Sequence, residues 1–243
     1  MGSAKDIIVK PISSKDARGI IKRLHYSHKV ANNSQLHFGV FINGICGGSL
    51  QFGPSLDKRK MIGLVFGTKW NEFIELNRMA LADWMPKNSG SRVLAVCMRL
   101  IKKNYPFIKW VVSFADGTQC GHGTQYQGAG FYLTGIKKNN QIWKAPSGAK
   151  FSRMSLTKGK NILESGGASM KSFANAGFVP LQGYQFRYIY FIDQKAKENL
   201  TVPIIPFSDI AKRGAKMYKG ISQASVVEKQ NTTPSSVEMA VQI

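Results

Sequence analysis

Two apolar segments joined by Asn43-Gly44 constrain the fold of this chain more than any other feature of its sequence. Residues 36–41 read Leu-His-Phe-Gly-Val-Phe, and residues 45–52 are again largely apolar. An Asn-Gly loop between two such segments favours a β-hairpin, because both loop residues can adopt the positive φ that the tight turn requires. The sequence therefore predicts an antiparallel strand pair in its first quarter.

Helical periodicity and further strand-like segments surround this hairpin. A helix is predicted after Ser13 or Ser14, with apolar residues at positions 17, 20, 21 and 24. A second helix follows a polar loop at 86–92, and its apolar residues are 93, 96, 97, 100 and 101. Strands are predicted at 75–81, 110–115, 130–133, 151–156 and 184–192, with a short helix around 125–127. This order predicts a mixed α/β fold whose partly antiparallel sheet is flanked by helices.

The chain changes character towards its C-terminal end. From Gln223 onward it is rich in Ser, Thr and Gln and shows little periodicity. We therefore expect a single domain over residues 1–207 and a flexible C-terminal extension over 208–243. The three cysteines are too few and too scattered for a disulfide framework or a cysteine-based zinc site. No apolar segment approaches the roughly 18 residues of a membrane helix, so we expect a soluble intracellular protein without a membrane partner.

A strong positive charge indicates a polyanionic partner. The chain has 34 Lys and Arg against 13 Asp and Glu, a net charge of +21. Residues 199–243 contribute five basic and three acidic residues, so nearly all the charge belongs to the rest of the chain. Nucleic acid is the commonest such partner, although a solvated basic face would have the same composition.

One long stretch of the chain contains basic residues and no acidic ones. No acidic residue occurs from Gly117 to Leu163, where Lys158 and Lys160 belong to the same basic stretch. Trp143 could stack on DNA or equally belong to the core. The candidate DNA contacts are Lys137, Lys138, Trp143, Lys144, Lys150 and Arg153.

The segment Tyr126-Gln127-Gly128-Ala129-Gly130-Phe131 resembles the Y-x-x-x-G-F segment of the GNAT acyltransferase fold. That resemblance implies two neighbouring strands that splay apart around an acyl-CoA thioester such as acetyl-CoA. It also implies that the Tyr126 hydroxyl protonates the departing thiolate, a step suited to a phenol. A tyrosine at this spacing could instead serve only in helix packing.

The loop Lys87-Asn88-Ser89-Gly90-Ser91-Arg92 resembles the GNAT pyrophosphate loop, which usually reads Q/R-x-x-G-x-G/A. Such a loop holds phosphates with backbone N–H groups at a helix N-terminus. Gly90 fits the pattern and Lys87 is a tolerable substitute, whereas Arg92 replaces a small residue. Arg92 therefore argues against a conventional acetyltransferase.

Seven segments in one order give a more specific resemblance. They are Leu24-His25-Tyr26-Ser27-His28, Phe38-Gly39-Val40-Phe41, Leu76-Asn77-Arg78, Pro86-Lys87-Asn88 with Ser91-Arg92, Ser113-Phe114-Ala115-Asp116, Gly121-His122-Gly123-Thr124-Gln125-Tyr126-Gln127 and Tyr188-Ile189-Tyr190-Phe191. Over roughly residues 10–207 the chain resembles the Mom family of phage DNA-modification proteins. The resemblance implies a GNAT-like fold and conversion of DNA adenine to N6-(carbamoylmethyl)adenine, which shields phage DNA from restriction in the cytoplasm of the infected bacterial host. It also implies an involvement of iron.

The resemblance and the residue chemistry together give a set of candidate site residues. His25 and His28 are three residues apart near a helix end, although His28 could simply make a local hydrogen bond. With Asp116, His25 and Tyr26 could supply iron ligands or acid–base groups. The catalytic candidates are His25, Tyr26, Asp116 and Tyr126, of which His25 and Tyr26 are also the metal candidates. The cofactor-binding candidates are Arg78, Lys87, Gly90, Ser91, Arg92 and Ser113.

Two of these candidates have an alternative explanation. Asp116 ends a buried-type strand, where its carboxylate would face the cleft, but Asp before Gly117 is also a common turn former. Arg78 could pair with Asp116 or with an anionic ligand, or it could face solvent.

The expected chemistry requires an adenine to leave the DNA stack. Base flipping is the usual solution, with Tyr26 and Phe114 as candidates for the base pocket. The adenine N6 is a poor nucleophile, and a carbamoylmethyl product needs a bond to an sp³ carbon that a thioester does not directly give. Two other functions fit the same charge: a conventional GNAT N-acetyltransferase acting on a nucleic acid or amine, and a non-catalytic DNA-binding protein. The predicted strand edges would also allow a homodimer.

Overall fold

The computed structural model describes residues 3–153, 156 and 170–223. The strands are β1 (Ile8–Pro11), β2 (Leu36–Ile42), β3 (Ile45–Gly53), β4 (Phe73–Leu81), β5 (Trp110–Asp116), β6 (Tyr132–Asn139), β7 (Ile142–Lys144), β8 (Lys150–Ser152), β9 (Val179–Pro180), β10 (Gly183–Phe191), β11 (Met217–Tyr218) and β12 (Ile221–Ser222). The helices are α1 (Ser14–Leu24), α2 (Lys58–Ile62), α3 (Ser89–Asn104), α4 (Thr124–Gly128), α6 (Met170–Asn175) and α7 (Ser208–Lys212), with 3₁₀ helices η1 (Ala4–Asp6) and η2 (Gln194–Asn199).

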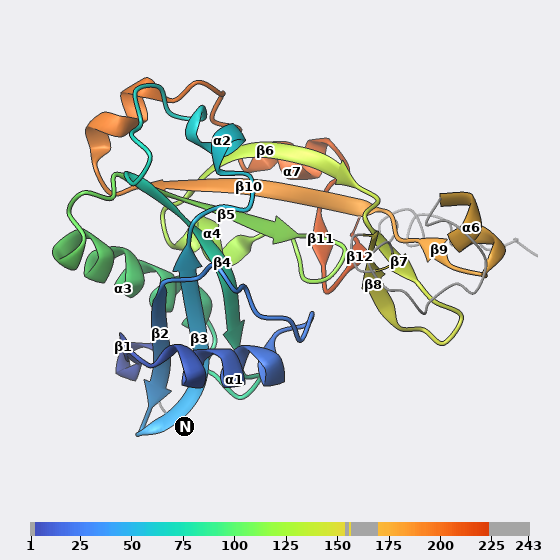
Figure 1. Ribbon diagram of the computed structural model, residues 1–243, viewed down its shortest axis with the longest axis horizontal. Helices are drawn as coiled ribbons and strands as arrows, with labels where there is room; N and C mark the ends of the chain where they lie inside the picture. Colours follow the sequence, from blue (N-terminus) through green and yellow to red (C-terminus); the bar gives the residue numbers. More distant parts are fainter. Residues whose placement is uncertain (1–2, 154–155, 157–169, 224–243) are drawn as a thin grey trace, which may run out of the picture.

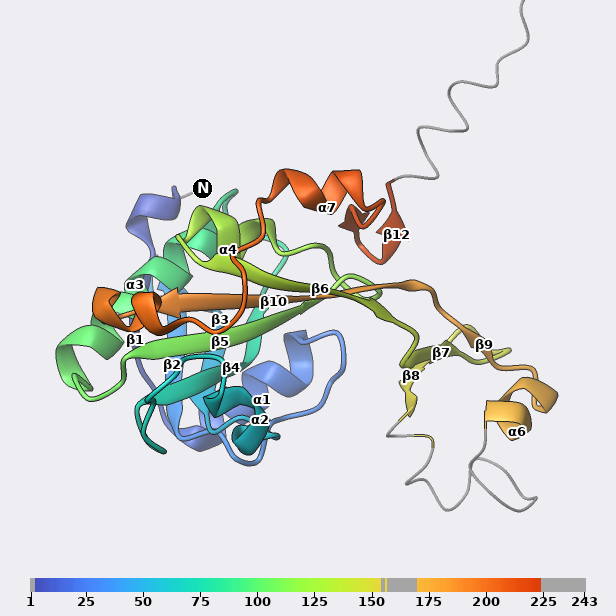
Figure 2. The ribbon, with the colours of Figure 1, turned by 90° about the horizontal axis from the view of Figure 1, so that it is seen from above.

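A seven-stranded sheet in the order β1-β2-β3-β4-β5-β10-β6 forms the centre of the protein (Figure 1). All its neighbouring strands are antiparallel except β4 and β5, which are parallel. Figure 2 shows α3 and α4 on one face of this sheet and α1 and α2 on the other. The predicted mixed α/β fold with a partly antiparallel sheet is therefore confirmed.

Local sequence signals explain the N-terminal elements. Asn43 and Gly44 both have positive φ, 51° and 79°, so the predicted hairpin forms as β2 and β3 around a tight turn. The backbone N–H of Asp16 donates to Ser13 Oγ at 3.1 Å, which caps α1 at the predicted place. Ala17 on the predicted apolar face of α1 is fully buried against the sheet.

Helix α3 begins earlier than the sequence predicts. The polar loop expected over 86–92 ends at Asn88, which has a left-handed conformation (φ 67°) and directly precedes the first helical residue, Ser89. The residues that follow already have helical geometry, so Gly90 and Ser91 lie in the first helical turn. The predicted apolar face of this helix is otherwise as expected, with Val93 and Cys97 fully buried.

The parallel strands β4 and β5 separate along their length. They pair only from Phe73 to Glu75 on β4 and from Trp110 to Val112 on β5. Beyond these positions β5 continues to Asp116 paired with β10, while β4 continues paired with β3. The two strands thus splay apart as the GNAT resemblance implies, and their C-terminal halves border a gap in the sheet.

Part of the predicted flexible extension is folded. Residues 208–223 form α7 and the β11–β12 hairpin, and Ile210, Ala215 and Met217 are buried against the domain. The domain therefore continues beyond residue 207, because these apolar side chains complete its main core. Residues 224–243 lie outside the described residues, as do 154 and 155 of the strand predicted at 151–156. Of that strand β8 covers 151 and 152, whereas 153 and 156 have helical geometry, so the predicted strand ends too late.

A smaller sheet, β8-β7-β9, extends from the end of the main sheet beside α6 (Figure 1). Its own apolar cluster contains Trp143, Leu156 and Phe173. Within the described ranges, no helix is both long and apolar enough to cross a bilayer.

Candidate active site

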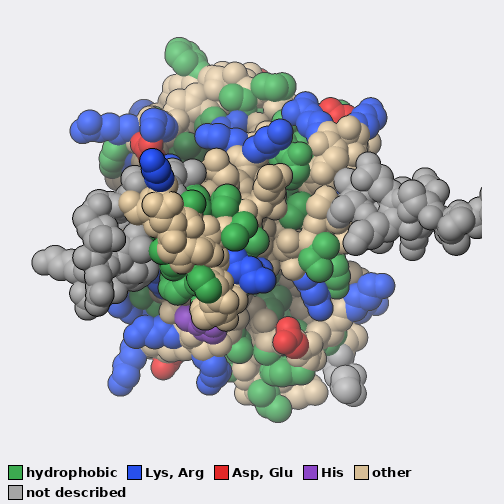
Figure 3. Space-filling model, turned by 90° about the vertical axis from the view of Figure 1, so that its right-hand side faces the viewer, with side chains coloured by type: hydrophobic (Ala, Val, Ile, Leu, Met, Phe, Trp, Pro, Cys, Tyr) green, Lys and Arg blue, Asp and Glu red, His purple; other side chains and the backbone are tan. Residues whose placement is uncertain are grey.

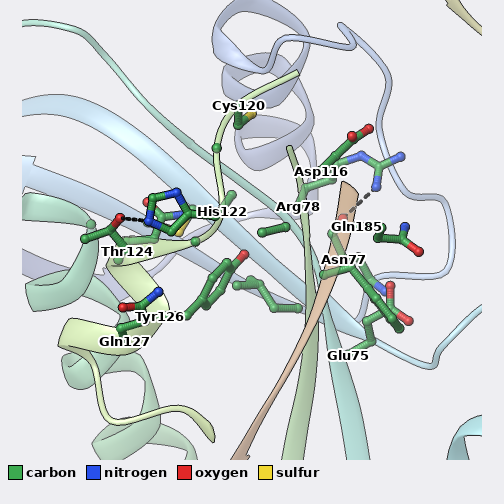
Figure 4. Close-up of a pocket in the computed structure, with 18 of the residues that line it drawn as sticks. Glu75, Asn77, Arg78, Asp116, Cys120, His122, Thr124, Tyr126, Gln127 and Gln185 are labelled. Atoms are coloured by element: carbon green, nitrogen blue, oxygen red, sulfur yellow. Dashed lines mark hydrogen bonds between the residues drawn. The ribbon is translucent and has the colours of Figure 1, made fainter. Parts of the chain in front are cut away.

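A cavity of about 920 Å³ lies where β4 and β5 diverge. The segments that line it are the C-terminal end of α1, β4, the end of β5, residues 120–128, the start of α3 and β11. Figure 4 shows Glu75 and Arg78 on one side of β5 and His122 and Tyr126 on the other. Seven of the predicted site residues line it together: His25, Tyr26, Arg78, Gly90, Ser91, Asp116 and Tyr126.

His25 is a buried, uncharged imidazole at the end of α1. Burial, aided by the positive charges of Arg78 and His28, lowers its pKa from 6.5 to about 4. Its Nδ1 accepts a hydrogen bond from the Ser27 backbone N–H at 3.1 Å, so the proton of the neutral ring resides on Nε2. His25 can therefore offer an N–H donor at neutral pH but not a positive charge.

Tyr26 follows at the mouth of the cavity. Its ring packs against that of His25 in a tilted arrangement, with ring centroids 4.2 Å apart, yet 47% of the residue remains exposed. Desolvation raises its pKa far above the usual value, aided by Cys120 and Asp116, so the phenol stays protonated. His28, in contrast, is outside the cavity and hydrogen-bonds the Lys22 carbonyl through Nδ1 at 2.9 Å, which is the local role left open for it.

Tyr126 is a buried residue of the cavity, with 5% of its surface exposed. Ser113 Oγ donates to its hydroxyl at 2.9 Å, and both side chains are buried. Burial raises the pKa of Tyr126 to about 12. Its ring stacks on Tyr188 at 5.0 Å, and Gly123 makes this possible, because a Cβ there would lie 2.6 Å from the Tyr188 ring. Ser113 thus positions Tyr126, which stays a neutral proton donor.

Asp116 both forms a turn and borders the cavity. Its Oδ1 accepts from the Thr118 backbone N–H and from Asn139 Nδ2, each at 3.0 Å, and also from the Thr118 hydroxyl. Asp116 therefore has both of the roles that the sequence left open: it forms a turn and it borders the cavity. Arg78 donates through Nε to the Lys29 carbonyl at 3.0 Å. Among the described residues it forms no ion pair with Asp116, because its guanidinium is directed to backbone oxygens.

Glu75 is a cavity residue that the sequence analysis missed. It lies in β4 at the last position paired with β5, where the two strands begin to separate. Burial raises its pKa, although hydrogen bonds from Ser55 and Asn77 and the charge of Arg78 oppose that effect. A carboxylate inside a predicted strand that is otherwise largely apolar is the available signal, since acidic residues are rarely buried without a partner.

The start of α3 also borders the cavity, through Asn88, Gly90 and Ser91. Gly90 is constrained by packing as well, because a Cβ there would lie 2.7 Å from Gln125 Oε1 of α4. Three predicted cofactor residues do not line the cavity: Lys87 is exposed elsewhere, Arg92 lies in α3, and Ser113 is fully buried in β5. Arg92 Nε is instead buried without a hydrogen-bond partner among the described residues.

Iron does not fit the side chains that line the cavity. Iron sites in proteins combine several imidazole, carboxylate or thiolate ligands. In the described part of the chain, no three His, Cys, Asp or Glu side chains come close enough to hold a metal ion. His25 Nδ1 is already engaged by Ser27. We therefore derive no step through iron.

Exposed cations lie on the adjoining small sheet and the end of β6. Figure 3 views the molecule from this side, where Lys and Arg outnumber Asp and Glu. Trp143 is an exception among the predicted contacts: it is only 2% exposed and packs on Phe173 with centroids 5.8 Å apart. Its ring serves the core and cannot stack on DNA. Lys158 and Lys160 lie outside the described residues. The predicted contacts that are exposed are Lys137, Lys138, Lys144, Lys150 and Arg153.

A family model described as the Mom protein family matches residues 6–209. The chain belongs to this family. Methylcarbamoylase mom of Escherichia phage Mu is 33% identical over 204 residues, which cover 83% of this chain and 82% of the relative. The resemblance seen over residues 10–207 is thus confirmed.

Two solved acetyltransferases resemble this family member in structure, with low sequence identity and TM-scores below 0.5. A ribosomal-protein alanine N-acetyltransferase from Escherichia coli has 10% identity and a TM-score of 0.44, covering 77% of this chain and 95% of its own. An acetyltransferase from Bacillus subtilis in complex with CoA has 9% identity and a TM-score of 0.44, covering 76% and 97%.

Proposed function

We propose that this Mom family member is a DNA-modifying transferase that adds a carbamoylmethyl group to N6 of adenine in double-stranded DNA. The observation that carries the proposal is the cavity between β4 and β5, which Glu75, Asp116 and Tyr126 all line and which adjoins an exposed basic surface. The phage Mu relative, named a methylcarbamoylase, supports the same chemistry. Acting in the cytoplasm of an infected bacterium, the modification would protect phage DNA from restriction.

The cavity suits a single extruded base better than a paired one. An amino group inside a duplex is reached by flipping its nucleotide into a pocket, where the base is held by aromatic or apolar side chains. Tyr26 and Phe114 are such side chains on the wall of this cavity. The exposed lysines on β6, β7 and β8 would meanwhile hold the phosphates of the flanking DNA.

Glu75 and Tyr126 would act as the general base and the general acid of the reaction. N6 loses a proton when it forms its new bond, and Glu75 is a suitable base because its raised pKa lies closer to neutrality than that of a free carboxylate. Tyr126, neutral and held by Ser113, would donate to the leaving group. His25 would contribute an Nε2–H hydrogen bond, because its other nitrogen is occupied.

An acyl-CoA donor fits the gap in the sheet. The diverging β4 and β5 would hold its extended arm, and the backbone at Asn88, Gly90 and Ser91 would face its phosphates. When bound, a CoA thioester would supply an activated carbonyl carbon. The bond from N6 to the methylene carbon of the carbamoylmethyl group forms at a different carbon, so it requires a further step that the thioester alone does not provide.

Expression in bacteria, followed by digestion of total DNA to nucleosides and mass spectrometry, tests the proposal. We expect a deoxyadenosine heavier by a carbamoylmethyl group, lost in Tyr126→Phe and Asp116→Asn and retained in Tyr105→Phe, a matched change on a tyrosine that does not line the cavity. An acetyl-sized increment would favour an N-acetyltransferase. Unmodified DNA together with salt-dependent duplex binding would favour a DNA-binding protein. Full activity in both cavity variants would overturn the site assignment.

A further inference from the structure

The β11–β12 hairpin closes one side of the cavity mouth, although it lies beyond the expected end of the domain. Its first residue, Met217, is buried, and the next, Tyr218, lines the cavity with 59% of its surface exposed. Figure 1 shows β11 beside the segment that follows β5. The hairpin therefore presents an aromatic ring to the opening through which a substrate would enter.

Specific contacts hold this hairpin in place. The Met217 carbonyl accepts from the His122 backbone N–H at 3.2 Å and from His122 Nδ1 at 2.8 Å. The Gly220 N–H donates to the Cys120 carbonyl at 3.1 Å, and Tyr218 forms a β-bridge with Gly121. The hairpin is thus joined to the same loop that leads into α4 and Tyr126, so its position is set relative to the cavity.

Close packing reinforces these hydrogen bonds. A Cβ at Gly117 would lie 2.8 Å from Met217 Cγ, and a Cβ at Gly220 would lie 2.6 Å from the Thr118 carbonyl oxygen. Gly220 also has a φ of 78°, which an L side chain rarely adopts. Two glycines, one on the domain and one on the hairpin, are therefore needed for the hairpin to approach this closely.

The charge around Tyr218 suits a nucleic acid. Lys219 Nζ lies 5.6 Å from the centroid of the Tyr218 ring. Lys150, one of the predicted DNA contacts, reaches the same hairpin, because a Cβ at Gly220 would lie 3.5 Å from its Nζ. Lys216 is exposed directly before the hairpin. The basic surface is therefore continuous with the aromatic ring at the cavity mouth.

We propose that Tyr218 is a base-stacking residue that holds the extruded nucleobase at the cavity mouth, with Lys219 and Lys150 placed for the adjacent phosphates. The proposal rests on the proposed DNA-modifying function and names a further residue that positions its substrate. An exposed ring on a rigid hairpin suits this role, because base–aromatic stacking needs a π-face and little else.

Duplex binding by the full chain tests the proposal without any donor. One duplex carries a central mismatched adenine, which is easily extruded, and a second of otherwise identical sequence is fully paired. Wild-type protein should prefer the mismatched duplex. Tyr218→Leu should weaken binding to that duplex by roughly 5- to 150-fold, the range for loss of one stacked aromatic ring, and leave the paired duplex nearly unaffected.

Two variants act as controls. Tyr218→Phe should bind as wild type, because it keeps the ring. Phe107→Ala removes a ring that is 55% exposed but does not line the cavity, and it should also change nothing. Wild-type affinity in Tyr218→Leu, or equal losses in the Phe and Leu variants, would overturn the stacking role. Adduct formation by wild type reports on the proposed function separately, so the two ideas can fail independently.

Discussion

Replacing His25 with glutamine should remove a large part of the protein's acid sensitivity. The ring is only 7% exposed, and its pKa falls from 6.5 to about 4 in the folded state. The unfolded chain therefore binds a proton between these two values that the folded protein does not, so the free energy of unfolding decreases as the pH falls through this window. At about 1.4 kcal/mol per pH unit, the full effect is about 3 kcal/mol at pH 4.

Urea unfolding of the wild type and the His25→Gln variant at a series of pH values measures this contribution. Between about pH 7.5 and about pH 4.5, the wild type should lose about 2.5 kcal/mol more stability than the variant. His28→Gln should leave most of this pH dependence in place, because burial is the largest cause of the lowered pKa of His25 and the charge of His28 is the smallest. A stability difference between wild type and His25→Gln that stays constant with pH would refute the buried, neutral state of His25.

Three further substitutions test the cavity and the small sheet. Tyr126→Phe removes the partner of the buried Ser113 hydroxyl. It should lower the free energy of unfolding, measured by thermal unfolding, by about 1–3 kcal/mol, and lower the rate of adduct formation at least about 100-fold. Glu75→Gln should increase stability at neutral pH, because the raised pKa shows that the fold disfavours the carboxylate, while adduct yield falls. Trp143→Ala should lower the free energy of unfolding by about 3–5 kcal/mol, because the ring is buried. Trp143→Phe should leave the affinity for duplex DNA in a salt titration unchanged, because the buried ring does not contact DNA.

The elements that the sequence predicts well depend on local chemistry. The Asn43-Gly44 turn needs only two residues that tolerate positive φ, and the start of α1 needs only the Ser13 hydroxyl. One cavity brings together side chains that are far apart in the sequence, such as His25, Tyr26 and Asp116. Residue spacing alone does not predict this placement, and the family resemblance was needed to identify these residues as one site.

The remaining features depend on tertiary contacts that leave no local pattern. Trp143 has the same lysine-flanked context whether it faces DNA or Phe173, and only the packing of the small sheet decides between them. Met217 and Tyr218 lie in a short segment without periodicity, and their placement follows from hydrogen bonds with the distant His122. Glu75 becomes a cavity residue only because β4 and β5 separate next to it.

The electrostatics of the cavity and of the surface around it are of opposite kinds. Inside, burial removes charge: it lowers the pKa of His25 and raises that of Tyr26, Glu75 and Tyr126. Outside, exposed lysines and arginines supply strong positive charge. A nucleotide has the matching division, since its base is uncharged and its phosphate is an anion. Around His25, Glu75 and Tyr126, burial thus favours entry of the base alone, because a DNA phosphate beside these side chains would lose the hydration and the cations that it keeps at the surface.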